Sequence, residues 1–120
     1  MDPFAIRSIL VGTDLTPRSD VPLRAAAAIA ELTGARLHIL HAFELEALPA
    51  DAAREPATFP ERVASARRAL DEQIRRVVPS TLSVASRLVE IYLPHKALLA
   101  QARRVSADVI VLGRREERNL

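Results

Sequence analysis

The stretch ILVGTDLTPRSDVPLRAAAAIAELTGARLHILHAF, residues 9–43, decides the fold. It opens with a continuous apolar run that ends in a glycine, a pattern typical of a strand buried on both faces. Ser19 or Asp20 can cap the alanine-rich helix that follows, and Gly34 can end that helix in a left-handed conformation. A second apolar run, residues 36–43, follows at once. Strand, helix and strand over so short a length predict a right-handed βαβ unit with two parallel strands.

The rest of the chain continues this alternation. Residues 44–57 have no apolar period and are expected to form a loop. Thr58 and Glu61 then form a capping-box pattern at the start of a second long helix, which Pro79 ends. Residues 82–91 carry more polar side chains than the first two strands, so we expect this third strand at an edge of the sheet.

The second helix is also expected to carry ion pairs. Asp71 and Arg75, like Glu72 and Arg76, are four residues apart and are therefore neighbours on the helix surface. We expect both pairs on the side of the helix that faces solvent.

Two more segments complete the predicted order. Pro94 starts a third helix, and the run DVIVLG, residues 108–113, is a fourth buried strand. Strands alternating with helices in this way predict an α/β protein: a three-layer α/β/α, doubly wound, Rossmann-like parallel sheet with strand order 3-2-1-4. We assign residues 1–113 to one domain and residues 114–120 to a charged C-terminal tail.

The composition excludes several classes of protein. Hydrophobic residues make up 49% and charged residues 27% of the 120 residues, which is typical of a soluble globular protein. There is no cysteine, so disulfides, thiolate metal sites and cysteine nucleophiles are excluded. No window approaches the roughly 18 apolar residues that cross a bilayer, and no basic leader precedes an apolar stretch. We therefore expect a cytoplasmic protein without a membrane partner.

The pI of about 9.9 does not by itself indicate nucleic-acid binding. The formal net charge is only +2, because 17 Lys and Arg residues are interleaved with 15 Asp and Glu residues. Three Phe, one Tyr and no Trp offer few platforms for base stacking. We expect no nucleic-acid partner.

Open parallel sheets bind ligands at the carboxyl ends of their strands, where the winding reverses direction. Asp14 is the carboxylate that this rule places in the crevice. It can accept hydrogen bonds from a ribose hydroxyl, or it can cap the loop TDLTP, and the sequence leaves both roles open. The residues predicted at this edge are Gly12, Thr13 and Asp14 after the first strand, Ala42 and Phe43 at the end of the second, and Gly113 after the fourth.

An aspartate after the first strand also occurs in phospho-acceptor receiver domains. Those domains need a second acid at the end of a central strand and a later lysine. Here the third strand ends in Tyr92, Leu93 and Pro94, and the only lysine, Lys96, falls in a helix. The receiver class is therefore excluded.

The three histidines do not predict a metal site. His38 and His41 are three residues apart on one strand, so they point to opposite faces and cannot chelate one ion. His38 is expected to be a packed or edge polar residue. His41 either contacts a ligand or, more commonly for such a position, bonds to the backbone in the core. His95, in the first turn of a helix, is expected in solvent.

The sequence contains no standard catalytic motif. The patterns GxxxxGK(S/T), GxGxxG and GxSxG are absent, which excludes the common NTPase, dinucleotide and esterase cradles. No serine or threonine nucleophile has a placed base. We predict no catalytic residue and no enzymatic activity.

Residues 9–43, together with LPHKALLAQARRVSADVIVLG, residues 93–113, resemble the universal stress protein family. The resemblance rests on the first strand ending in Asp14, the alanine-rich helix, the second strand with His41, and the helix that leads into VIVLG. It implies an adenine nucleotide alpha hydrolase-like fold. For the ATP-binding branch of the family it also implies a crevice in which the acid matching Asp14 and the backbone near Ala42 approach the nucleoside.

The chain departs from the family pattern in the phosphate loop. A glycine matching Gly113 opens that loop, which proceeds as Gly-x-x-Gly, nine residues, and Gly-Ser or Gly-Thr. Here Gly113 is followed by Arg114, Arg115 and then Glu116. A side chain at that point hinders backbone N–H groups from approaching phosphate oxygens, and a carboxylate repels them. Arg114 either neutralises a phosphate or belongs to a solvated tail.

The family's fourth helix and fifth strand have no counterpart before Leu120, so the sequence resembles a shortened or divergent member. The fifth strand of the family commonly pairs across a dimer axis. Without it the fourth strand is an apolar edge, which invites strand addition. We therefore predict self-association into a homodimer or a higher oligomer.

The sequence thus predicts a universal stress protein-like stress-response protein with a weakened adenine-nucleotide crevice. ATP or another adenine nucleotide is the expected ligand. One alternative is a ligand-free, homo-oligomeric interaction module. A second is an enzyme of the adenine nucleotide hydrolase type, such as an ATP pyrophosphatase. Such enzymes usually carry an SGGxxS-like loop after the first strand, which GTDLTP, residues 12–17, does not match.

Overall fold

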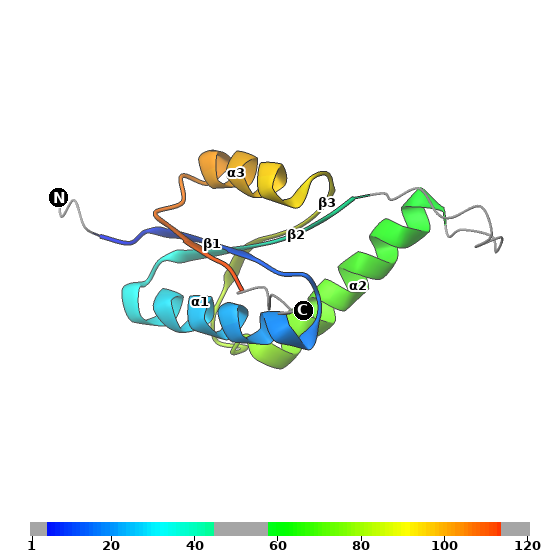
Figure 1. Cartoon of the computed structure of the whole chain (residues 1–120). Coiled ribbons are helices and arrows are strands. Elements are labelled where there is room, and N and C mark those ends of the chain that lie inside the picture. The colour runs from blue at the N-terminus through cyan, green and yellow to red at the C-terminus, as the bar shows by residue number, and fades with distance from the viewer. Residues whose placement is uncertain (1–4, 45–57, 114–120) are drawn as a thin grey trace, which may run out of the picture.

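The computed structural model describes residues 5–44 and 58–113. The predicted tail, including Arg114, lies outside these residues, so the domain boundary at residue 113 stays a prediction. Within them, strands and helices alternate as the sequence predicts (Figure 1). The elements are β1 (Ser8–Gly12), a 3-10 turn (Pro17–Ser19), α1 (Asp20–Thr33), β2 (Arg36–Phe43), α2 (Phe59–Val77), β3 (Val84–Ile91), α3 (Pro94–Arg104) and β4 (Val109–Val111).

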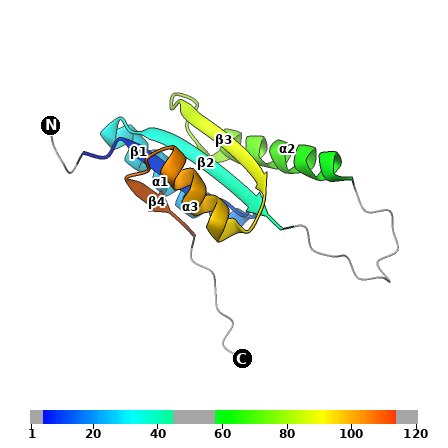
Figure 2. The same cartoon turned by 90° about the horizontal axis from the view of Figure 1, so that it is seen from above.

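The strands of the described residues form one parallel sheet in the order β3-β2-β1-β4, which confirms the predicted order. Seen from above, they run side by side in this order, with β3 and β4 at the two edges (Figure 2). Ile9, Leu10 and Val11 of β1 are completely buried, because β1 has a neighbour on each side and helices on both faces. The more polar β3 lies at an edge, as expected.

The helices cover the two faces of the sheet unequally (Figure 1). α1 and α2 pack on one face, over the larger core, which includes Ile9 and Val11. α3 packs on the other face, where Leu10, Leu40 and Ala97 form a smaller core. In the two described ranges, no helix has both the length and the hydropathy needed to cross a bilayer.

The ends of α1 and α2 follow from the sequence. Gly34 ends α1 with φ 73°, a left-handed conformation that a residue without a Cβ adopts at little cost, and its N–H donates to Ala30 O at 2.9 Å. Thr58 and Glu61 make both bonds of the predicted capping box at the start of α2. The cap predicted at the start of α1 is not made: Ser19 is the N-cap residue but makes no side-chain cap hydrogen bond, because its Oγ donates to Asp14 Oδ1 instead.

The two ion pairs predicted along α2, Asp71 with Arg75 and Glu72 with Arg76, are wrong, because these residues pair with other partners. α2 lies beside α1 and β3, and its charged side chains can reach those elements as easily as their own helix. A spacing rule for one isolated helix does not include these neighbours. The observed pairs are Arg76 with Asp20, Arg87 with Asp71, and Arg75 with Glu72.

The pair between α1 and α2 predicts a pH-dependent stability. Arg76 Nη1 lies 2.6 Å from Asp20 Oδ2, and its Nη2 lies 3.1 Å from Asp20 Oδ1. Hydrogen bonds from Arg76, and then from Gln73, lower the pKa of Asp20 from its ordinary 3.8 to about 2. A carboxylate whose pKa is lower in the folded state stabilises the fold above its ordinary pKa, and this contribution is lost as the pH falls through about 2.

We therefore expect Asp20→Asn to lower the urea midpoint at pH 7 and to differ less from the wild type as the pH falls from 4 towards 2. Asp71→Asn is the matched control, because Asp71 pairs with Arg87 and its side chain is 56% exposed. It should change the midpoint little at any pH. An Asp20→Asn deficit that stays constant down to pH 2 would contradict the pairing.

Candidate functional site

A cavity lies at the carboxyl ends of the strands, where the winding of the sheet changes direction. β1 leads to β2 through α1 on one face, whereas β3 leads to β4 through α3 on the other. Because β1 and β4 are neighbours, their flanking connections leave a crevice between them. Its volume is about 540 Å³, within the roughly 300–1,000 Å³ typical of small-molecule sites.

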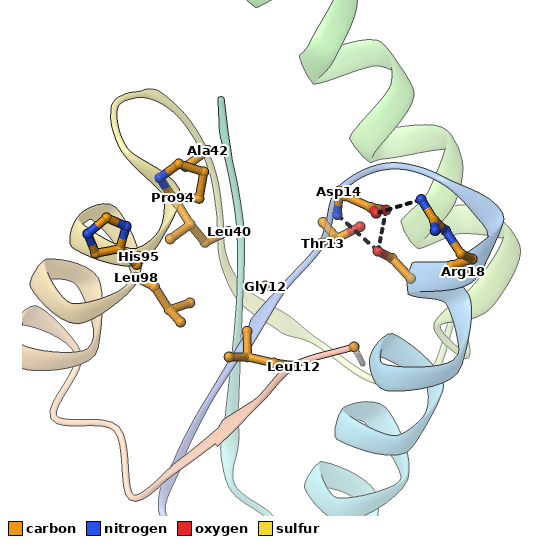
Figure 3. Close-up of a pocket in the computed structure, with 12 residues that line it drawn as sticks. Gly12, Thr13, Asp14, Arg18, Leu40, Ala42, Pro94, His95, Leu98 and Leu112 are labelled. Atoms are coloured by element: carbon orange, nitrogen blue, oxygen red, sulfur yellow. Dashed lines mark hydrogen bonds and ion pairs between the residues drawn. The ribbon is translucent and has the colours of Figure 1, made fainter. Parts of the chain in front are cut away.

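The cavity has polar groups at its ends and an apolar wall between them. Figure 3 shows Asp14 and Arg18 on one side and Pro94 and His95, from the first turn of α3, on the other. The wall between these groups consists of side chains from β2, from α3 and from the residue that follows β4: Leu40, Ala42, Leu98 and Leu112.

One oxygen of Asp14 holds the loop between β1 and α1. Asp14 Oδ1 accepts hydrogen bonds from the Thr16 N–H at 2.9 Å, from Thr16 Oγ1 at 2.6 Å and from Ser19 Oγ at 2.5 Å. The loop-capping role considered from the sequence is therefore present. The other oxygen, Oδ2, lies 4.0 Å from Arg18 Nη2, and the Asp14 side chain is 53% exposed. Asp14 thus holds its loop with one oxygen, while the other faces Arg18 and the cavity.

Asp14 is ionised at neutral pH. Partial burial acts to raise its pKa, but the hydrogen bonds from Ser19 and Thr16, with the charge of Arg18, outweigh burial and leave the pKa below its ordinary 3.8. The carboxylate is therefore a hydrogen-bond acceptor only, which suits a hydroxyl donor such as that of a sugar.

A buried amide supports this loop from behind. Gln73 of α2 is 2% exposed. Its Oε1 accepts from Thr13 Oγ1 at 2.6 Å, and its Nε2 donates to Thr16 O at 3.3 Å and to Asp20 Oδ1 at 3.0 Å. Gln73 was not predicted from the sequence, although a glutamine three residues after the buried Leu70 on an apolar helix stripe is a signal for a buried polar contact.

Gly12 keeps the floor of the cavity open. A Cβ at this position would lie 3.0 Å from Leu112 Cδ2 and 3.4 Å from Leu98 Cδ1. Both leucines belong to the apolar wall. A side chain at residue 12 therefore has no room unless these leucines shift.

Five of the seven residues predicted from the sequence line the cavity: Gly12, Thr13, Asp14, Ala42 and Gly113. Arg114 lies outside the described residues. Four residues that supply charged, polar or apolar side chains to the lining were not predicted: Arg18, His95, Leu98 and Leu112. Their placement depends on how the 3-10 turn, α3 and β4 pack.

The structure places Phe43 away from the cavity. Successive residues of a strand point to opposite faces, so Phe43 faces α2 when Ala42 faces the cavity. Its ring stacks on His41 with centroids 5.6 Å apart and lies 5.8 Å from the guanidinium carbon of Arg62. The same alternation, applied to the sequence, would have shown that Ala42 and Phe43 cannot both line the cavity.

The histidines on β2 take structural roles. His41 Nδ1 donates to the Thr13 carbonyl at 2.8 Å, which is the backbone-bonded core role that the sequence favours. His38 is buried and its Nδ1 lies 2.7 Å from Ser86 Oγ on the edge strand β3. His95 is exposed, as expected, although it borders the cavity. Among the described residues, no group of three His, Asp or Glu side chains converges as a metal site would require.

The fold and the crevice define a doubly wound α/β domain with a cavity at its switch point. The chain belongs to the universal stress protein family, whose model matches residues 5–120. Among curated proteins, none matches the sequence significantly.

Solved structures share the fold over most of this chain. A universal stress protein family member from Burkholderia pseudomallei is 26% identical, with a TM-score of 0.68, over 94% of this chain and 85% of that one. A universal stress protein in complex with cAMP is 21% identical, with a TM-score of 0.69, over 89% of this chain and 75% of that one. A protein from Archaeoglobus fulgidus in complex with dAMP is 21% identical, with a TM-score of 0.57, over 91% of this chain and 82% of that one.

Proposed function

We propose that this protein is a non-catalytic, cytoplasmic stress-response protein that binds the adenosine part of a nucleotide in the crevice between β1 and β4. The observation that carries this proposal is the cavity itself. It combines a partly free carboxylate, Asp14, with an apolar wall, at the position where open α/β sheets bind ligands.

The two parts of adenosine match the two parts of the cavity. A ribose hydroxyl can donate to Asp14 Oδ2, because the three loop bonds all go to Oδ1. A flat, largely apolar base fits against the wall that includes Leu40, Leu98 and Leu112. Two structural neighbours, described as complexes with cAMP and dAMP, support an adenine ligand.

The phosphates are expected to contribute little. Gly113 lines the cavity, but in the sequence it is followed by Arg114, Arg115 and Glu116 instead of a second glycine. A cradle of backbone N–H groups needs close approach without side chains, and Glu116 adds a like charge. The proposed ligand set is therefore adenosine, AMP and ATP at similar affinity.

The direct test is a calorimetric titration of the wild-type protein with adenosine, with guanosine as a matched control. We expect weak, saturable binding of adenosine and weaker or no binding of guanosine. If neither adenosine nor any adenine nucleotide binds, the alternative of a ligand-free interaction module takes its place.

The enzyme alternative makes a different prediction. A hydrolase of the related fold would turn over ATP steadily, and Asp14→Asn would abolish that turnover. The hydrogen bonds from Thr16 and Ser19 hold the loop and lower the pKa of Asp14, so its carboxylate is a weak general base. We therefore expect no ATP turnover by the pure protein.

We also propose self-association through β4. Ile110 is 40% exposed and Leu112 is 57% exposed, and within the described residues β4 pairs only with β1. An apolar strand with a free edge favours addition of another strand. Sedimentation should show a dimer or higher oligomer at high micromolar concentration.

Ile110→Lys should weaken this assembly at least tenfold, because a lysine on an edge strand opposes strand pairing. Leu32→Lys is the matched control, since Leu32 is 87% exposed on α1. It should leave the assembly unchanged. A wild-type protein that sediments as a clean monomer would refute the proposal.

A further inference from the structure

A buried side chain of α2, Gln73, contacts the segment that carries Asp14, and the half-exposed Arg76 of α2 also pairs with Asp20 at the end of this segment. Gln73 is among the largest fully buried side chains of the protein. Its amide makes three hydrogen bonds, to Thr13, Thr16 and Asp20. All three partners belong to residues 13–20, the segment between β1 and the first turn of α1.

Burying an amide is costly unless its hydrogen bonds are made, so Gln73 is stable only when this segment has its observed conformation. An apolar side chain of the same size could fill the space on α2 without this condition. The glutamine therefore ties the conformation of the loop to the packing of α2.

The bonds of Gln73 bracket a strained residue. Leu15 has φ 66°, an uncommon conformation for a residue with a bulky side chain. On one side, the Thr13 hydroxyl donates to Gln73 and accepts from the Leu15 N–H at 3.0 Å. On the other side, the Thr16 carbonyl accepts from Gln73. Asp14 lies between the two anchor points and next to Leu15.

We propose that Gln73 is a positioning residue for the crevice, which holds the β1–α1 loop in the conformation that presents Asp14 Oδ2 to the ligand. The inference rests on the proposed adenosine site. Gln73 does not line the cavity, so it acts on the ligand only through the loop. If it is absent, a smaller fraction of molecules has the loop in the binding conformation, and the apparent affinity falls by that fraction.

The test compares Gln73→Met with Ile74→Val, the next residue of α2. Methionine keeps the length of the side chain but makes none of the three bonds. Ile74 is buried in the same core and makes no side-chain hydrogen bond, so its variant controls for a small change in packing. We expect Gln73→Met to weaken adenosine binding by about tenfold and Ile74→Val by less than twofold.

Amide hydrogen exchange gives a second readout that needs no ligand. The Leu15 N–H donates to Thr13 Oγ1, and the Thr16 N–H donates to Asp14 Oδ1. Both amides should exchange faster in Gln73→Met than in Ile74→Val, while amides in the middle of β1 stay protected in both. Unchanged exchange of Leu15 and Thr16 in Gln73→Met would overturn the positioning role.

These readouts separate the two proposals. If the wild type binds no adenosine but Gln73→Met loosens the loop, the proposed function fails and the positioning of the loop stands. If the wild type binds and both Gln73→Met readouts match the control, the positioning role fails alone.

Discussion

Replacement of Asp14 by alanine is expected to remove adenosine binding, with at least a tenfold loss of affinity in calorimetry. Asp14 is the only carboxylate that lines the described cavity, and its Oδ2 is the acceptor that we propose for the ribose. A hydrogen bond to a charged group contributes roughly 1.5–3 kcal/mol when its loss leaves a partner unpaired. An affinity that is already weak therefore falls below detection.

Two matched variants separate the ligand role of Asp14 from its loop role. Thr16→Val removes the bond from Thr16 Oγ1 but keeps the carboxylate, so adenosine binding should change less than threefold. Asp14→Asn keeps an oxygen for the loop but loses the charge, so the fold should be retained while binding weakens. Full adenosine binding by Asp14→Ala would show that the base alone, or another part of the molecule, carries recognition.

Gly12→Val is expected to block the cavity with little loss of stability. The new side chain would meet Leu112 and Leu98, and these would be displaced into the space of the ligand. Leu112 is 57% exposed, so it can move at low cost, and valine is favourable in a strand. Adenosine binding should fall by more than tenfold while the urea midpoint changes only slightly.

Gly34→Ala is the complementary control, because it should change stability and not binding. Gly34 lies at the end of α1 with φ 73°, and no atom lies within 4 Å of an added Cβ. Alanine there is strained by about 1–2 kcal/mol without a steric clash. This variant should lower stability and leave the affinity for adenosine unchanged. Equal binding by Gly12→Val and the wild type would show that the ligand does not occupy this cavity.

The fold was predictable because its signals are local. The apolar runs of β1 and β2 and the alanine-rich α1 lie within residues 9–43, and each is legible in a short window. The polar side chains of β3 were enough to predict its edge position, because a strand with one free edge tolerates them. Partners across helices were not predictable in this way, as the pair of Arg76 with Asp20 shows.

The candidate site was predictable in part. The rule for strand ends located Gly12, Asp14 and Gly113, because it needs only the order of the strands. It could not locate Arg18 or Gln73, whose positions depend on how a turn and a helix pack against each other. Applied without the alternation of side chains along a strand, it also included Phe43, which faces α2.

The central claim is that the crevice recognises adenosine and gains little from the phosphates. Calorimetric titration of adenosine, AMP and ATP against the wild-type protein tests it most directly. We predict similar, weak dissociation constants for all three ligands. ATP binding more than about a hundredfold tighter than adenosine, roughly 2.7 kcal/mol of phosphate recognition, would contradict the claim and show that arginine side chains have replaced the glycine cradle.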